Sequence, residues 1–255
     1  MSVEIADSLD AAQTGRVAIT SLPGLDDLDV SQAYLVQASA FAHRLARGEQ
    51  ASGVKLGFTS RAKMAQMGVD ELIVGRLTGA MCVEDGGTLD IEMLIHPRVE
   101  PEIAFRLSRD VDPSDPLEDL RTAIDAVAPA LEVIDSRYEG FSFSLPGVIA
   151  DNTSAAAYAI GPWRPFSVRD ELDIGNLAVA LTVDGARVEV GSSAAILGHP
   201  LRTLPALKSM AAKHNVELKR GFVVLAGAAT AAVPLRRGVV EARVAGLGRV
   251  AIEAS

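Results

Sequence analysis

The chain has 255 residues, of which 49% are hydrophobic and 22% are charged, and its formal net charge is −9. This composition provides for a sizeable apolar core and excludes a disordered polymer. The acidic balance argues against a nucleic-acid partner, because phosphate recognition needs basic patches. The single cysteine, Cys82, excludes an intrachain disulfide and a zinc cluster of cysteines.

The N-terminal stretch MSVEIADSLDAAQTG is acidic and lacks the basic and apolar regions of a secretory signal peptide. The longest uncharged run, GFVVLAGAATAAVPL at residues 221–235, contains glycine and proline and is shorter than the roughly 20 residues of a membrane helix. We therefore expect a cytoplasmic protein without a membrane segment, and a core strand and turn over residues 221–235.

Residues 2–48 carry a helical pattern. Apolar residues recur near a period of 3.6 from Ala33 to Leu45, and Gly48 is the expected end of this helix. Beyond it, short apolar runs separated by turns predict a body rich in β-strands. The chain is therefore expected to be α+β, with a helical N-terminal region over residues 1–50 and a β-rich body over residues 51–255, counted as one or two domains.

Within the body, the run LTVDGARVEV at residues 181–190 predicts a β-hairpin with an Asp-Gly turn. Two helices are expected to interrupt the strands, over residues 115–131 and residues 200–215. Further strands are expected over residues 52–58, 87–95, 102–107, 130–137, 177–192 and 248–254.

Acidic residues stand inside two of these apolar runs. Glu100 and Glu102 are two residues apart, so they share one face of a strand, where unpaired carboxylates would repel and the pKa of one would rise. A divalent cation removes that cost, and hard oxygen ligands suit Mg²⁺, Mn²⁺ or Ca²⁺. Glu132 could supply a third ligand from a neighbouring strand. On spacing alone, the solvated face of an edge strand, with Glu132 in a salt bridge, explains the same residues.

Five segments occur in a characteristic order along the chain. They are GVKLGFTSRAKMAQMGV (53–69), HPRVEPEIAF (96–105), APALEVIDSR (128–137), VIADNTS (148–154) and LGHPL (197–201). In these segments the chain resembles the hydratase/decarboxylase branch of the fumarylacetoacetate hydrolase-like superfamily, enzymes of aromatic meta-cleavage degradation. The resemblance implies a mixed sheet rolled into a barrel-like body, and a Mg²⁺ or Mn²⁺ ion held by Glu100, Glu102 and Glu132.

Members of this branch either hydrate 2-hydroxypenta-2,4-dienoate or decarboxylate 2-oxohex-3-enedioate to that dienoate. Hydratase relatives carry an acid just after the segment GVD, where this chain has the apolar Leu72, Ile73 and Val74, with Glu71 too early. The segment LAGAATAAVPL also resembles the decarboxylase type. We therefore expect metal-dependent decarboxylation of 2-oxohex-3-enedioate. The hydratase is the alternative, and a catalytically silent scaffold for a partner hydratase is the second.

The resemblance also places Lys55 in the active site, where it could hydrogen-bond the enolate oxygen or a carboxylate and move a proton. Composition alone would make it a surface lysine. Arg61 and Lys63 are candidates for contact with the leaving carboxylate, and a solvated helix face explains them equally well. Ser154 is a candidate donor to a substrate oxygen, with an N-cap or Asx turn as the alternative.

The expected partners follow from the same resemblance. They are a small dianionic 2-oxo acid as substrate, further copies of the chain in a homo-oligomer, and a 2-hydroxypentadienoate hydratase in a complex. No nucleic acid and no membrane is expected among them.

Overall fold

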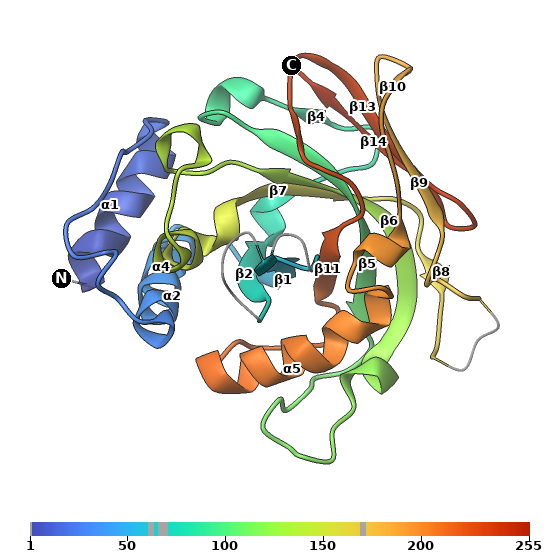
Figure 1. Cartoon of the computed structure of the whole chain (residues 1–255), viewed down its shortest axis with the longest axis horizontal. Coiled ribbons are helices and arrows are strands. Elements are labelled where there is room, and N and C mark those ends of the chain that lie inside the picture. The colour runs from blue at the N-terminus through green and yellow to red at the C-terminus, as the bar shows by residue number, and fades with distance from the viewer. Residues whose placement is uncertain (1, 61–63, 66–70, 169–171) are drawn as a thin grey trace.

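The structure is a computed structural model that describes residues 2–60, 64–65, 71–168 and 172–255. Within these residues the chain forms two β-sheets, and helices pack beside the larger one (Figure 1). The α-helices are α1 (Ser2–Gly15), α2 (Val30–Ala46), α4 (Leu145–Ala150) and α5 (Thr203–His214).

The larger sheet is mixed. In the described residues its strand order is β2-β1-β11-β5-β6-β7-β3, with β12 paired to β5 and β8 paired to β6. The pairs β1–β11 and β3–β7 are parallel and the others are antiparallel. These strands are β1 (Ala51–Gly57), β2 (Ile73–Thr78), β3 (Cys82–Val83), β5 (Arg98–Leu107), β6 (Ile124–Ile134), β7 (Ala155–Ile160), β8 (Arg164–Pro165), β11 (Val223–Ala228) and β12 (Val233–Pro234).

This sheet is rolled, as the resemblance implied. The Ser52 hydroxyl on β1 lies 2.9 Å from the Tyr158 hydroxyl on β7, although β11, β5 and β6 stand between these two strands in the sheet. The strands β5, β6 and β7 curve around β1, β2 and β11 in Figure 1. Side chains on the inner face of the roll therefore meet across it, even when their strands are not neighbours.

The smaller sheet covers the outside of the roll. Its order is β10-β9-β13-β14-β4, and Leu131 and Val133 of β6 share a buried apolar cluster with Leu181 and Ile252 of this sheet. The predicted hairpin around Asp184 and Gly185 is confirmed, since β9 and β10 flank that turn. The strands are β4 (Thr88–Leu89), β9 (Ala178–Val183), β10 (Ala186–Ser192), β13 (Gly238–Val244) and β14 (Gly248–Ala254).

The N-terminal helices pack against the body. Asp29 caps α2 through a reciprocal capping box with Gln32, and the chain leaves the helix at Gly48 with a φ of +96°. Ile5 of α1 and Val36 of α2 share a buried cluster with Ala150 of the body. A division of the chain near residue 50 therefore stays a proposal, and this shared core favours one folding unit.

Two sequence-based predictions were wrong, and the helix predicted over residues 200–215 was right. Residues 115–131 do not form a helix: a 3-10 turn covers Leu120–Ala123 and β6 follows directly. Because β6 is buried on both faces, its apolar run lacks the alternation that distinguishes a strand from a helix. Over residues 87–95 only β4 is extended, since the Asp90 carboxylate accepts the Glu92 N–H and starts a 3-10 turn.

Among the described residues, no helix has both the length and the apolar character needed to cross a bilayer.

Candidate metal centre

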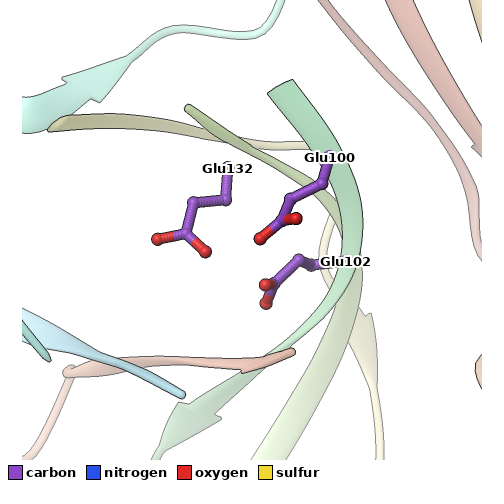
Figure 2. A group of neighbouring side chains, drawn as sticks. All are labelled: Glu100, Glu102 and Glu132. Atoms are coloured by element: carbon purple, nitrogen blue, oxygen red, sulfur yellow. The ribbon is translucent and has the colours of Figure 1, made fainter. Parts of the chain in front are cut away.

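Three carboxylates meet on the inner face of the rolled sheet. Glu100 stands directly opposite Glu132 in the β5–β6 register, and Glu102 follows on the same face of β5. Oxygen atoms of the three side chains lie within 4.8 Å of one another, and Figure 2 shows the side chains converging. Because β5 lies between β11 and β6, the alternative of a solvated edge strand is wrong. Glu102 and Glu132 are fully buried, and Glu100 is half-buried.

A β-bulge beside this cluster fixes the orientation of Glu102. Pro101 has no N–H for the ladder, and between Leu225 and Ala228 the strand β11 carries one residue more than β5 opposite it. The bulge contains Gly227, which has a φ of +115°, and this backbone conformation directs the Gly227 N–H to Glu102 Oε2 at 2.8 Å. A Cβ atom at this position would lie 1.9 Å from Thr59 Oγ1, so only glycine fits.

In the described part of the chain, two carboxylate oxygens of this cluster are buried without the hydrogen bonds that buried polar atoms usually have. Glu102 Oε1 and Glu132 Oε2 are buried and have no hydrogen-bond partner among the described residues. Burial, followed by the charges of Glu132 and Glu100, raises the pKa of Glu102 well above its ordinary value. Unsatisfied buried oxygens cost about 1–3 kcal/mol each, more when charged. A cation that accepts these oxygens as ligands would remove this cost.

Lys55 is buried in the same site, so the reading as a surface lysine is wrong. Its Nζ atom lies 3.0 Å from Glu132 Oε1 and donates to the Thr153 carbonyl oxygen at 3.1 Å. Burial by itself would lower the pKa of Lys55, but the carboxylates of Glu132, Glu100 and Glu102 outweigh it and raise this pKa. The lysine is therefore a charged partner of the carboxylate cluster, and its ammonium group lies beside the carboxylates that would hold a cation.

Ser154 lies close to this lysine, in the short turn Asn152–Ser154. Its hydroxyl donates to Asp151 Oδ2 at 3.2 Å, and Asp151 also forms a buried ion pair with Arg137. Asp135 takes no part in this ion pair, and its carboxylate accepts the N–H groups of residues 95 and 96. A contact between Ser154 and substrate stays a prediction.

The other candidates are distributed as follows. Arg61 and Lys63 lie outside the described residues. His199 caps the turn that follows it, since its Nδ1 accepts the Leu201 N–H at 3.1 Å. Ile73 is buried, whereas Glu71 is exposed and lies 3.5 Å from the Lys213 ammonium.

Sequence reasoning missed two backbone groups, the Gly227 N–H and the Thr153 carbonyl. No pattern of side chains in the sequence indicates which backbone groups will contact a site. A glycine inside a predicted strand is the signal that could have indicated the bulge at Gly227.

Fold and site together define a rolled mixed sheet with a candidate centre for a divalent cation. Residues 77–253 match the model of the family described as fumarylacetoacetate (FAA) hydrolase C-terminal, and the chain belongs to this family. It is 50% identical to a 4-oxalocrotonate decarboxylase of a Pseudomonas species, over 92% of this chain and 90% of that protein.

More distant relatives include a 2-keto-4-pentenoate hydratase of Paraburkholderia xenovorans (strain LB400). It is 34% identical, over 98% of this chain and 93% of that protein. Among solved structures, the chain is similar to 4-oxalocrotonate decarboxylase from Pseudomonas putida G7 complexed with magnesium and adipate. That likeness has a TM-score of 0.91 and 36% identity, and it covers 100% of this chain and 97% of the other.

Proposed function

We propose that this protein is a metal-dependent decarboxylase that converts 4-oxalocrotonate (2-oxohex-3-enedioate) to 2-hydroxypenta-2,4-dienoate. The observation that carries the proposal is the buried cluster of Glu100, Glu102 and Glu132 with Lys55 beside it. The 50% identical decarboxylase supports the reaction. Adipate, found in the similar solved structure, is a six-carbon dicarboxylate like the proposed substrate.

The donor set fits Mg²⁺ or Mn²⁺. Glu100, Glu102 and Glu132 would hold the ion, because they offer only hard oxygen atoms and two of these are buried without a hydrogen-bond partner among the described residues. When bound, the ion supplies Lewis-acid stabilisation of the negative charge that develops on the 2-oxo oxygen. It also offsets part of the charge of a dianionic substrate, which a protein of net charge −9 otherwise repels.

The reaction breaks the bond between C5 and the C6 carboxylate. The bonding pair moves through the conjugated carbons to the C2 oxygen, CO₂ leaves, and one proton is then needed to complete the dienol. We assign this proton to Lys55 Nζ, which is fixed by Glu132 and by the Thr153 carbonyl and is kept protonated by the carboxylates around it. Ser154 would donate to a substrate oxygen if its hydroxyl hydrogen turns from Asp151 Oδ2 to the substrate.

One observation separates this reaction from the hydratase alternative. Ile73 lies two residues before Gly75, the partner of Lys55 in the β1–β2 register, so Ile73 faces the same side as that lysine. It is buried, and a Cβ atom on Gly57 would lie 2.9 Å from its Cγ1. An apolar side chain thus stands on the face where hydration needs an acid. We expect Ile73→Asp to gain dienoate hydration.

The test uses purified protein with Mg²⁺ and 2-oxohex-3-enedioate, followed by NMR, and a second sample with 2-hydroxypenta-2,4-dienoate. We expect metal-dependent CO₂ release from the first and no added water in the second. Hydration of the second alone would replace this proposal with the hydratase. Inactivity on both, with Mg²⁺ bound, would favour a silent scaffold.

The proposal extends to assembly. We propose a homo-oligomer that associates with a 2-hydroxypentadienoate hydratase, since that enzyme consumes the dienoate product. Light scattering measures the molar mass of the chain alone and in a mixture with the hydratase. A monomeric mass in both samples, with no complex in the mixture, would contradict both associations.

A further inference from the structure

The turn next to Lys55 has a backbone that is costly for its sequence. Asn152, Thr153 and Ser154 have φ angles of 51°, 52° and 59°, all in the left-handed region. Asparagine tolerates this region better than most residues, but a run of three residues other than glycine is unfavourable, and a β-branched residue such as Thr153 is a genuine outlier. Conformations of this kind persist only where the surrounding structure holds them.

The side chain of Asn152 provides much of that hold. Its Nδ2 donates to the Arg76 carbonyl oxygen at 2.8 Å, and its Oδ1 accepts the Arg76 N–H at 2.7 Å. Arg76 belongs to β2, which stands at the end of the described strand order of the larger sheet. The Asn152 carboxamide therefore makes the two backbone hydrogen bonds to Arg76 that a neighbouring strand would otherwise make, and it joins the turn to β2.

This junction determines where the next residue points. The Thr153 carbonyl accepts the Lys55 ammonium at 3.1 Å, and Gly75 lies beneath both. A Cβ atom on Gly75 would lie 2.3 Å from Thr153 Oγ1, 2.7 Å from the Asn152 carbonyl oxygen and 3.0 Å from Lys55 Cδ. The turn, the glycine and the lysine stem are thus packed without room for one methyl group.

The hydroxyl of Thr153 adds a second observation. Thr153 is buried, and its Oγ1 has no hydrogen-bond partner among the described residues, although it lies against the same glycine as the lysine stem. A buried hydroxyl without a partner is destabilising. Its position beside Lys55 fits a turn that serves the site at a cost in stability.

We propose that Asn152 is a positioning residue for Lys55: its carboxamide fixes the left-handed turn to Arg76, and the turn then aims the Thr153 carbonyl at the lysine ammonium. The inference rests on the proposed function for its effect on turnover. Its effect on the position of Lys55 is independent of that function.

The test is Asn152→Gly, because glycine adopts the same φ without strain and removes only the two side-chain hydrogen bonds. Asn215→Gly is the matched control, since Asn215 is an exposed residue with a φ of 52° at the end of α5. Asn152→Asp is the second variant, because it keeps an acceptor for the Arg76 N–H and loses the donor.

We expect Asn152→Gly to lower kcat by roughly 10- to 100-fold, the usual range for residues that orient an active-site group, with KM changed less than about twofold. Asn152→Asp should fall in between, and Asn215→Gly should match the wild type. In metal-free protein, acetic anhydride should acetylate Lys55 several-fold faster in Asn152→Gly, relative to Lys213, as measured by peptide mass spectrometry.

An unchanged kcat together with unchanged acetylation of Lys55 would overturn the inference, as would a lower Tm with normal kcat and labelling. If the wild-type protein does not decarboxylate 4-oxalocrotonate, the proposed function fails, and the acetylation rate alone decides on the role of Asn152. Should Asn152→Gly fail to fold, the same two measurements on Asn152→Asp decide.

Discussion

The substitution Lys55→Met tests the charge balance of the site most directly. It replaces the ammonium 3.0 Å from Glu132 Oε1 with an uncharged side chain of similar length. The side chains of Lys55 and Glu132 are 4% and 1% exposed, so solvent cannot compensate for the loss. Removing one partner of a buried ion pair typically costs about 3–5 kcal/mol, because the other charge stays buried. We expect the unfolding free energy of the metal-free protein to fall by this amount.

Magnesium should reverse part of that loss. The lysine charge repels a cation bound by the same carboxylates, so removing it should tighten Mg²⁺ binding. A ligand at 100 times its Kd stabilises a protein by about 2.7 kcal/mol, and a lower Kd increases this gain. The stabilisation by a given Mg²⁺ concentration should therefore be larger in Lys55→Met than in the wild type. Turnover should still fall by roughly 10²–10⁴-fold, since the proton donor is lost.

Urea unfolding in EDTA and in Mg²⁺, for both proteins, measures these free energies. A Lys55→Met protein as stable as the wild type in EDTA would refute the buried pair. Equal stabilisation of both proteins by Mg²⁺ would show that Lys55 and the ion do not share the three carboxylates. Normal turnover would remove the lysine from the reaction.

Two other predictions concern the ligands and their support. Because the pKa of Glu102 is raised in the fold, its contribution to stability is fully present below the unfolded pKa and is lost as the pH rises through the folded one. Metal-free wild type should therefore lose stability as the pH rises above the ordinary pKa of a glutamate, and Glu102→Gln should lose less. Equal slopes of the unfolding free energy against pH for the two proteins in urea would contradict the shift. Gly227→Ala should weaken Mg²⁺ binding by roughly 10- to 100-fold in calorimetry, because the new Cβ atom meets Thr59 and turns the Gly227 N–H away from Glu102. Gly221→Ala is the control: Gly221 has a φ of +82° and open space around it, so this variant should bind Mg²⁺ like the wild type.

Much of the local structure was predictable from the sequence. Helix α2 was found because its apolar residues follow a helical period and Gly48 ends it, and the β9–β10 hairpin because its Asp-Gly turn favours positive φ angles. The placement of Glu100 and Glu102 on one face of β5 follows from the alternation of side chains in any strand. These features depend on dihedral preferences and spacing within a few residues.

The first part of β6 was not predictable in the same way, although the strand expected over residues 130–137 covers the end of β6. Its residues from Ile124 to Leu131 are buried on both faces, and such a run has the same apolar character in a helix and in a strand. Pairing with β5 and β7 decided between them, and it also placed Glu132 opposite Glu100.

The sequence by itself determined which residues share a strand face, where the chain turns, and that carboxylates stand inside apolar segments. Only the tertiary structure decided that Lys55 reaches Glu132, that the Gly227 N–H holds Glu102, and that Asn152 ties its turn to Arg76. The physical reason is that these contacts arise from the roll of the sheet and from a bulge opposite Ile103, which bring together groups on strands that are far apart in the chain.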